Sequence, residues 1–334
     1  MMDYIGRGSI EHLFPLLSEK VLVMTRESLL KRYGEVLSPL LRREDTVFYT
    51  DINPNPSLDE IREAQQKIGG QEYACIVALG GGSVIDFAKA FRHYEQSPAR
   101  LIAIPTTAGT GSEATQFSVI YMEGVKQSLD APELLPDVSI VDSQFIEDSP
   151  RYLKACCAMD ALCQAIESYW AKGATEQSRQ WAIEAIELCR EHLVHAVLSA
   201  DKQANEGMAK ASHLAGKAIN ISRTTAAHAL SYKITSRYGI PHGHAVALSI
   251  AGLFRANLPT TVGKDELLRA LGIAEESIED HFFRLTQSIG METRLPLLGI
   301  EDVDDIVDSV NPQRLGNNPT TLSREQMKQL FLLQ

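Results

Sequence analysis

The feature that most restricts the fold of this chain is a series of short apolar segments, separated by helix-like segments, in roughly the first 145 residues. The segments are almost continuously apolar, as expected for parallel strands that helices cover on both faces. This alternation predicts an α/β domain with a parallel sheet. The predicted strands cover residues 21–25, 46–50, 74–79, 101–105 and 138–142.

The pattern changes after Asp148. Ser149 and Pro150 form a helix-start signal, because proline is well tolerated in the first turn of a helix. Amphipathic helical windows then follow one another without a clear strand, and residues 151–170 and 176–198 are the strongest of them. We therefore predict an α/β domain over residues 1–148 and an all-α metal and substrate domain over residues 149–334.

Charge and cysteine usage narrow the possible partners. A net charge of −11 disfavours nucleic acid and anionic membrane surfaces, and an acidic substrate would need a few local cations. No apolar run approaches membrane-spanning length, and the N-terminus lacks the layout of a signal peptide. The five cysteines include no C-x-x-C pair, which is typical of reduced thiols in a cytoplasmic protein.

Two loops rich in glycine and hydroxyl groups follow neighbouring predicted strands. The GGGS segment at 80–83 stands before a helix, where free backbone N–H groups and the helix dipole favour an anion such as a pyrophosphate. The next strand runs into IPTTAGTGSEAT at 104–115. Loops at the carboxyl ends of parallel strands form the crevice in which open α/β sheets bind nucleotides. The first loop alone is also compatible with a tight strand–helix turn.

Three side chains of the helical domain suggest a metal site. His228 and His242 lie on either side of a Gly-Ile-Pro break, so they come from different helical segments. Asp160, Gln164 and Glu167 have the spacing of one helix stripe. An aspartate with two histidines leaves positions for water or substrate, as in catalytic zinc and ferrous sites. Buried histidines bonded to backbone carbonyls are the alternative.

These motifs, in this order, resemble the iron-containing, or group III, alcohol dehydrogenase family, whose fold is shared by glycerol dehydrogenase and dehydroquinate synthase. The resemblance implies an N-terminal dinucleotide domain, a helical C-terminal domain and a divalent metal in the cleft between them. Ferrous iron is the expected metal, with zinc as the alternative, and a homodimer is the assembly that the resemblance suggests. The matching segments are 54–56, 80–86 with Lys89, 105–113, Lys126, 135–142, 159–168 and 228–243.

The resemblance places the metal ligands on Asp160, Gln164, His228 and His242. Gln164 departs from the family, whose dehydrogenases usually have histidine there. Tyr232 is a second departure, because many members have a proton-relay histidine four residues after the first histidine ligand. Tyrosine, with an ordinary pKa of about 10, is a poorer proton shuttle at neutral pH, and His244 is the alternative proton donor.

The resemblance also predicts which residues bind the dinucleotide. Members that prefer NAD tend to have aspartate where this chain has Arg26. An acid there binds the ribose 2′-hydroxyl and repels a 2′-phosphate, whereas arginine does the reverse, so we expect NADPH to be preferred over NADH. The other predicted cofactor-binding residues are Gly81, Gly82, Ser83, Asp86, Thr106, Thr107, Thr110, Ser112 and Lys126.

Within this family the metal is expected to act as a Lewis acid on an aldehyde oxygen while the nicotinamide delivers hydride. The phrases QAIESYW, AINISRTTAAHALSY and YGIPHGHAVAL resemble one subgroup, the phosphonoacetaldehyde reductases, which produce 2-hydroxyethylphosphonate in phosphonate biosynthesis. Arg223 and Lys217 precede His228 and could bind the headgroup of a small anionic aldehyde, as could Arg237 after it. A solvated helix face is the alternative for each of these basic residues.

Three other functions remain compatible with the sequence. The first is another small-aldehyde or alcohol dehydrogenase of the same family. The second is a lyase of the dehydroquinate synthase type, which would need more lysines and arginines around a sugar phosphate. The third is a catalytically silent binding protein, because Gln164 and Tyr232 both replace family histidines.

Overall fold

The computed structural model of the chain describes residues 1–199 and 201–331. The chain forms two compact units, Met1–Asp148 and Ser149–Gln334. The first unit contains a parallel sheet with helices, and the described residues of the second form helices joined by loops, with no strand. The predicted fold class, an α/β domain followed by a helical domain, is therefore confirmed.

The first unit is built on a six-stranded parallel sheet with the strand order β1-β8-β5-β4-β2-β3. Five of the strands are those that the apolar runs predict, and β1 at the edge of the sheet is additional. The strands are β1 (Met2–Ile5), β2 (Val21–Met24), β3 (Thr46–Tyr49), β4 (Cys75–Gly80), β5 (Arg100–Pro105) and β8 (Val138–Val141).

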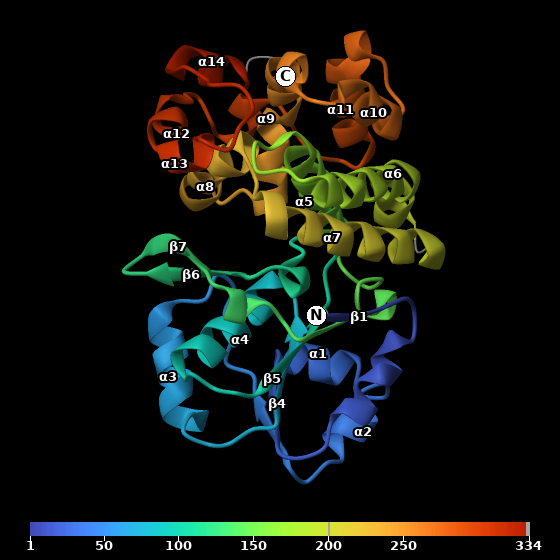
Figure 1. Cartoon of the computed structure of the whole chain (residues 1–334), viewed down its shortest axis with the longest axis vertical. Helices are drawn as coiled ribbons and strands as arrows, with labels where there is room; N and C mark the ends of the chain where they lie inside the picture. The colour runs from blue at the N-terminus through green and yellow to red at the C-terminus, as the bar shows by residue number, and fades with distance from the viewer. Residues whose placement is uncertain (200, 332–334) are drawn as a thin grey trace. The chain divides into compact units, whose positions relative to one another are not determined.

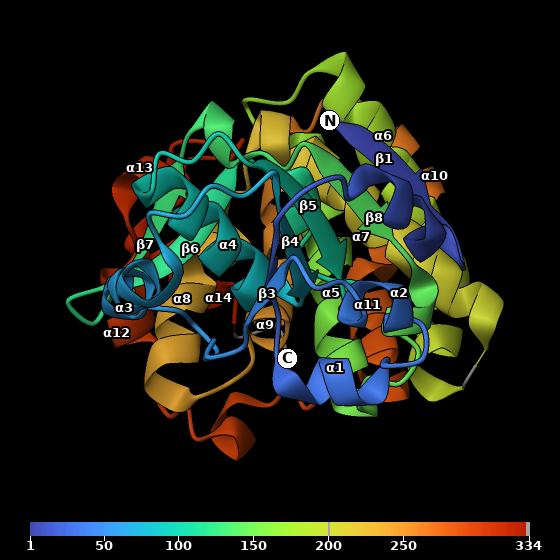
Figure 2. The same cartoon turned by 90° about the horizontal axis from the view of Figure 1, so that it is seen from below.

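Four α-helices, several short 3-10 helices and an antiparallel hairpin accompany the sheet in this unit. The helices are α1 (Glu27–Arg32), α2 (Ser38–Leu41), α3 (Leu58–Ile68) and α4 (Gly82–Tyr94). The hairpin consists of β6 (Phe117–Met122) and β7 (Val125–Asp130), and it was not predicted from the sequence. Figures 1 and 2 show the sheet with α3 and α4 on one side and α1 and α2 on the other.

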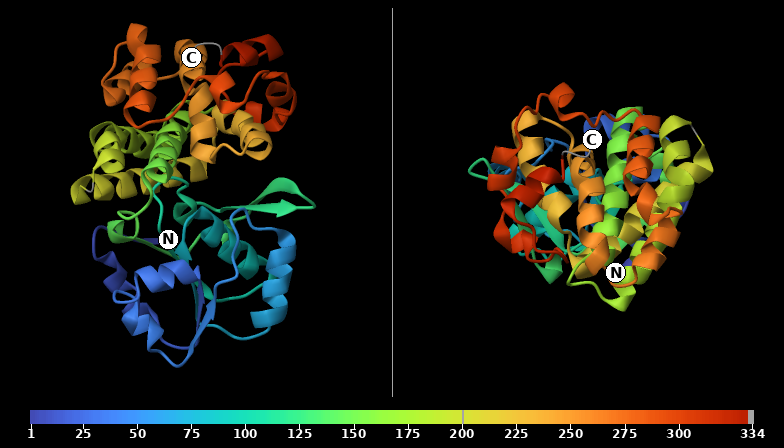
Figure 3. Two further views of the ribbon diagram at one scale, coloured as in Figure 1. Left: turned by 180° about the vertical axis from the view of Figure 1, so that it is seen from behind. Right: turned by 90° about the horizontal axis from the view of Figure 1, so that it is seen from above.

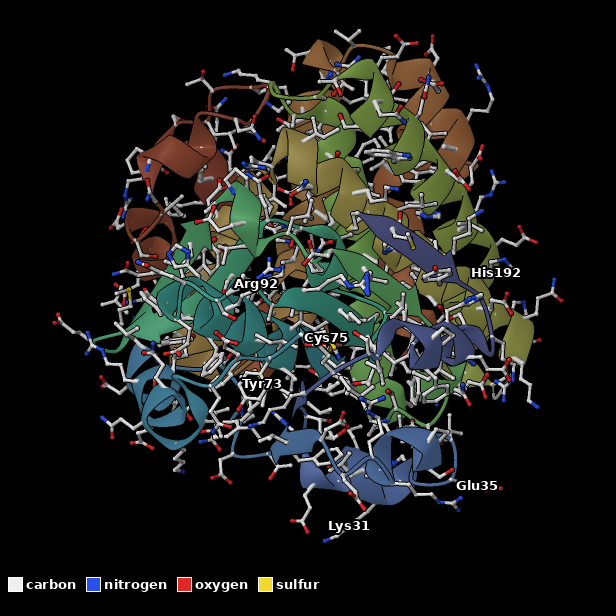
Figure 4. The ribbon with its side chains drawn as sticks, turned by 60° about the horizontal axis from the view of Figure 1, so that its bottom comes forward. Lys31, Glu35, Tyr73, Cys75, Arg92 and His192 are labelled. Carbon is white, nitrogen blue, oxygen red and sulfur yellow. The ribbon has the colours of Figure 1, made fainter. Side chains whose placement is uncertain are left out.

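The apolar strands separate two hydrophobic cores, because successive strand residues point to opposite faces. Leu22 and Met24 pack in the core with residues of α3 and α4. Val21 and Val23 pack in the other core with residues from the α1 and α2 side. In Figure 4, Lys31 and Glu35, which are exposed, point away from the sheet. Coverage on both faces explains why these strands have no polar alternation.

The strand order creates a switch point between β2 and β4. The chain continues from β2 to β3 on one side of this pair and from β4 to β5 on the other. Ligands of open α/β sheets bind outside the carboxyl ends of strands at such a point. The first glycine loop follows β4 and Arg26 follows β2, so both lie at this edge of the sheet.

The second unit consists of helices around a long buried helix, α5. All residues from 158 to 170 of α5 are buried, as expected for a helix that neighbours surround. Figure 3 shows α5 between α6 and α7 on one side and α8 and α9 on the other. The helices are α5 (Arg151–Trp170), α6 (Glu176–Leu198), α7 (Lys202–Ser222), α8 (Ala226–Tyr238), α9 (His242–Asn257), α10 (Lys264–Leu271), α11 (Ile278–Ser288), α12 (Asp304–Asp308), α13 (Pro312–Leu315) and α14 (Arg324–Gln329).

The predicted break between the two histidines is present in the structure. Gly239 ends α8 with a positive φ of 68°, a conformation that glycine adopts without a steric penalty. Pro241 then directly precedes the first residue of α9, His242. Among the described residues, no helix combines the length and the apolar character needed to cross a membrane.

Candidate functional site

Asp160, His228 and His242 form a compact cluster of possible metal ligands. One donor atom from each side chain lies within 4.8 Å of the others. His228 Nε2 is 3.2 Å from Asp160 Oδ1, and His242 Nε2 is 4.0 Å from the same oxygen. Ligands bound to one ion at about 2.1 Å cannot be more than about 4.2 Å apart, so two of these distances already match a metal site. The three predicted ligands therefore converge, although they come from three different helices.

The close approach of α9 to α5 brings His242 to Asp160. Gly243 is the second residue of α9 and packs directly on the α5 backbone. A Cβ atom at this position would lie 1.9 Å from the carbonyl oxygen of Cys156 and 2.9 Å from Asp160 Cβ. Only glycine allows the two helices to approach so closely. Gly243 therefore helps to position its neighbour His242 beside Asp160.

Glu167 is a second buried carboxylate in contact with this cluster. It lies on the same face of α5 as Asp160, and its Oε2 is hydrogen-bonded to His228 Nδ1. Its Oε1 accepts hydrogen bonds from residues at the start of α8. The helix spacing of Glu167 is evident in the sequence, but no function was predicted for this residue. That spacing, two turns after Asp160, was the signal that pointed to it.

The surroundings of the cluster favour a cation. Burial alone would raise the pKa of Asp160, but the imidazoles of His242 and His228 outweigh it and lower that pKa. Burial would lower the pKa of His228, but Glu167 and Asp160 outweigh it and raise the pKa to about 9. Both ferrous iron and zinc accept these imidazole and carboxylate donors. The residues present therefore fit a divalent metal.

Gln164 and Tyr232, the two departures from the family pattern, both lie next to the cluster. Gln164 is buried one turn after Asp160, and its side chain hydrogen-bonds to that carboxylate. The Tyr232 ring stacks on the His242 ring, with 6.0 Å between the ring centroids. The role of Gln164 as a fourth ligand and that of Tyr232 as a proton donor remain predictions.

His244 has partners of a different kind. Residues two apart on a helix do not share a face, so His244 projects away from the side of α9 that carries His242. Its Nδ1 is 2.8 Å from the Tyr152 hydroxyl, and its Nε2 is 2.6 Å from the carbonyl oxygen of Glu292. Both ring nitrogens are therefore engaged, and burial lowers the pKa of this imidazole.

Two of the three basic residues proposed for the substrate lie against other helices. The Lys217 ammonium lies 4.8 Å from the centre of the Trp181 ring on α6. Arg237 forms an ion pair with Asp305 at the surface. For Lys217 and Arg237 the structure thus favours the alternative of cations on a helix face, because each contacts a neighbouring helix.

Arg223, the third basic residue, occupies a strained turn between α7 and α8. Its φ of 65° and ψ of 172° are rarely adopted by residues other than glycine. The turn is held on both sides, because Ser222 Oγ donates to Ser168 Oγ at 2.8 Å and Asn317 Nδ2 donates to Ser222 O at 2.8 Å. The Arg223 guanidinium itself donates to the carbonyl of Asn220. The fold therefore enforces an unfavourable conformation at this cation.

The two predicted nucleotide loops lie against each other. Gly81 caps the start of α4, and Gly82 is the first residue of that helix. A Cβ on Gly82 would lie 2.9 Å from Thr110 Oγ1, and one on Gly81 would lie 3.3 Å from Thr107 Oγ1. The loops also share a backbone hydrogen bond of 3.0 Å, from Thr106 N to Gly80 O. They thus form one surface of glycine backbone and threonine hydroxyls at the start of a helix.

A buried polar network between α4 and the second loop holds this surface in place. Asp86 Oδ1 accepts a hydrogen bond of 2.5 Å from Ser112 Oγ, which joins α4 to the second loop. The Lys89 ammonium donates to Ser112 Oγ at 3.2 Å and to the carbonyls of Thr115 and Phe117, each at 2.7 Å. Burial lowers the pKa of Lys89 to about 8, although Asp86 opposes this shift. Asp86 and Ser112, two of the predicted cofactor-binding residues, therefore bond to each other and connect α4 to the second loop.

The remaining predicted cofactor residues border the loops. Ser83 Oγ accepts a hydrogen bond of 3.2 Å from Asn55 N. Lys126 on β7 contributes to the electrostatic environment of Asp86, whose pKa burial raises. Arg26 is the second residue after β2, and the pairing of Met24 with Ala78 places it near the end of β4. The Arg26 Nε is buried without a hydrogen-bond partner among the described residues.

Most of the chain matches one protein family. Residues 3–143 match the family described as iron-containing alcohol dehydrogenase, and residues 154–333 match the C-terminal region of the Fe-containing alcohol dehydrogenase family. This chain belongs to the iron-containing alcohol dehydrogenase family. One relative of this alcohol dehydrogenase is the NADPH-dependent butanol dehydrogenase of Clostridium saccharobutylicum, 30% identical over 368 residues that cover 98% of this chain and 95% of that protein.

Two further relatives of this alcohol dehydrogenase have names that refer to short aldehydes. The phosphonoacetaldehyde reductase of Streptomyces viridochromogenes is 28% identical over 340 residues, covering 90% of this chain and 85% of that protein. The crystal structure of sulfoacetaldehyde reductase from Bifidobacterium kashiwanohense in complex with NAD+ superimposes with a TM-score of 0.92 at 28% identity, covering 99% of this chain and 96% of that chain.

Membership of the family confirms the prediction of an NAD(P)-linked alcohol dehydrogenase or aldehyde reductase. It favours that activity over a lyase of the dehydroquinate synthase type and over a silent binding protein. The resemblance to the phosphonoacetaldehyde reductase subgroup is also confirmed, because a member of it is among the relatives.

Proposed function

We propose that this alcohol dehydrogenase reduces a small aldehyde with an anionic headgroup, converting phosphonoacetaldehyde into 2-hydroxyethylphosphonate in phosphonate biosynthesis. The observation that carries the proposal is Arg223, a cation in a strained turn five residues before His228, the proposed metal ligand on α8. Strained residues outside glycine are concentrated at functional sites. The headgroups named in two relatives, phosphonate and sulfonate, are both tetrahedral anions that a guanidinium recognises well.

Asp160, His228 and His242 would hold the divalent metal, with Gln164 as a fourth ligand. The metal, when bound, supplies Lewis-acid polarisation of the aldehyde oxygen. Tyr232, whose ring stacks on His242, would donate the proton that the new alcohol oxygen gains. His244 is the second candidate for this donation, but it projects away from His242 and bonds to Tyr152 and to the Glu292 carbonyl, so Tyr232 is the preferred donor.

Replacing Arg223 with alanine tests the substrate. A hydrogen bond to a charged group contributes about 1.5–3 kcal/mol, so kcat/KM for phosphonoacetaldehyde is expected to fall by about 10- to 100-fold. With butanal, which has no anionic headgroup, kcat/KM is expected to stay within about twofold of the native value. Steady-state NADPH oxidation with the two aldehydes measures both effects.

The conservative variant Arg223→Lys is the matched control, because it keeps the positive charge and, like alanine, places a Cβ atom in the same strained turn. It is expected to recover part of the lost kcat/KM for the phosphonate aldehyde. Equal losses for both aldehydes would show that Arg223 supports only the fold. Comparable native activity on both aldehydes, with no loss in the alanine variant, would instead favour a general small-aldehyde dehydrogenase, the function named in the butanol dehydrogenase relative.

Arg26 supports NADPH as the preferred cofactor, because its buried Nε has no hydrogen-bond partner among the described residues at the switch point of the sheet. We expect Arg26→Ala to lower kcat/KM for NADPH by about 10-fold or more, since a charge-assisted hydrogen bond to the 2′-phosphate is lost. The value for NADH should change by less than about twofold. A clear preference of the native enzyme for NADH would contradict this assignment.

We further propose that the metal is ferrous iron, with zinc as the alternative, and that the enzyme is a homodimer in the cytoplasm. All five cysteines are free thiols, which suits a reducing compartment. Metal analysis of protein purified without chelator distinguishes iron from zinc. Light scattering in solution measures the assembly.

A further inference from the structure

Glu167 is a fully buried carboxylate that accepts hydrogen bonds on both oxygens. Its Oε1 accepts from Thr225 N at 3.1 Å, from Thr225 Oγ1 at 2.6 Å and from Ala227 N at 2.9 Å. Its Oε2 is bonded to His228 Nδ1. Three of these four donors belong to the first residues of α8 or to its N-cap, and the fourth is the side chain of a proposed metal ligand.

The bonds on Oε1 give α8 its N-terminal cap. The first N–H groups of a helix have no partner within the helix and need one from elsewhere. The N-cap residue Thr225 supplies no capping bond, because its hydroxyl instead donates to Glu167. A carboxylate at this position also interacts favourably with the helix dipole. A side chain of α5 thus sets where α8 begins.

The bond on Oε2 selects one tautomer of His228. A carboxylate can only accept, so Nδ1 of the imidazole must carry the hydrogen. In the neutral ring, Nε2 then has the lone pair, and Nε2 is the nitrogen that lies 3.2 Å from Asp160. Outer carboxylates that bond the second nitrogen of a metal-binding histidine fix its orientation and raise its basicity.

We propose that Glu167 is a positioning residue that fixes both the start of α8 and the metal-binding tautomer of His228. The inference rests on the proposed function, because that function assigns His228 as a ligand. Glu167 belongs to α5, which also carries Asp160, so one helix supplies a ligand and orients a second one. Metal affinity is therefore expected to depend on a residue that itself does not bind the metal.

The variant Glu167→Gln separates this role from simple packing, because it keeps the shape of the side chain and replaces one acceptor with a donor. If its NH2 group faces α8, it meets the N–H groups of Thr225 and Ala227. If it faces His228, it forces the hydrogen onto Nε2, the nitrogen needed for the metal. Both orientations disturb the site, so we expect the dissociation constant for Zn²⁺ to rise by about 10- to 100-fold.

Tyr169→Phe is the matched control for destabilisation of α5. Tyr169 is buried on the same helix, two positions after Glu167. Its hydroxyl donates to Gly263 O at 2.9 Å and to Glu266 Oε2 at 2.7 Å, and not to His228. Chelator competition with Zn²⁺ and the Tm of the metal-free protein are measured for both variants. We expect both Tm values to fall, but the Zn²⁺ affinity only in Glu167→Gln.

The outcomes distinguish this inference from the proposed function. A native protein that binds no divalent metal would overturn both. Tight Zn²⁺ binding by the native protein with an affinity within about twofold in Glu167→Gln, or an equal loss in Tyr169→Phe, would overturn the positioning role alone. If Glu167→Gln yields no folded protein, Glu167→Asp takes its place, since it keeps the charge but shortens the side chain. The inference then requires that Glu167→Asp binds Zn²⁺ more weakly than Tyr169→Phe does.

Discussion

Replacing His228 with alanine is expected to abolish aldehyde reduction, with a loss in kcat of at least about 10³-fold. Lewis-acid stabilisation of the developing charge contributes several kcal/mol, and each 1.36 kcal/mol corresponds to about tenfold in rate. The substitution removes the imidazole between Asp160 and Glu167, and it leaves both carboxylates buried without that partner. Aldehyde-dependent NADPH oxidation and metal content measure the effect.

The nucleotide-binding unit should remain intact in this variant. The glycine and threonine loops lie in the unit Met1–Asp148, which has two hydrophobic cores of its own on either side of its sheet. The dissociation constant for NADPH is therefore expected to stay within about twofold of the native value. His195→Ala provides the control, because it removes an exposed histidine on α6. Retained turnover in His228→Ala would remove the metal site from the proposed function.

The sheet was predictable wherever its strands are buried on both faces, because such strands are continuously apolar. β4, for example, is buried along its whole length. The edge strand β1 was not predictable in this way, since it is only four residues long and contains Asp3 and two exposed ends. The hairpin of β6 and β7 is similarly exposed along β7, where polar residues alternate irregularly. Strands at edges gain less from burial, so their composition says less about their structure.

For the metal cluster, residue types and helix spacing carried most of the information. Asp160, His228 and His242 could be grouped because helix breaks and a helix stripe restrict where each side chain points. Partners contributed by other helices could not be derived in the same way. The stacking of Lys217 on Trp181 and the bonds of His244 to Tyr152 depend on which helices become neighbours. Local sequence patterns do not reveal those neighbours.

Gly243→Ala is expected to weaken metal binding by about 100-fold although the residue has no side chain. The new Cβ would lie 1.9 Å from the carbonyl oxygen of Cys156, well inside van der Waals contact. That oxygen belongs to the backbone of α5, so α9 itself must move by about 1 Å or more. Metal–ligand distances tolerate only about 0.2 Å, so the neighbouring ligand His242 would be displaced from Asp160. A misplacement of about 1 Å can also reduce turnover by about 100-fold.

Gly252→Ala, in the same helix, separates this local effect from general overpacking. A Cβ at Gly252 would lie 2.4 Å from the carbonyl oxygen of Leu330, so this variant introduces a comparable backbone clash. Gly252 is nine positions after Gly243, which corresponds to about 13.5 Å along the helix axis. Both variants should lose about 1–3 kcal/mol of stability, as overpacked cores do. Only Gly243→Ala should lose Zn²⁺ affinity in chelator competition, because only that clash lies beside His242. Equal affinity in the two variants would mean that the contact between α9 and α5 does not position the ligand.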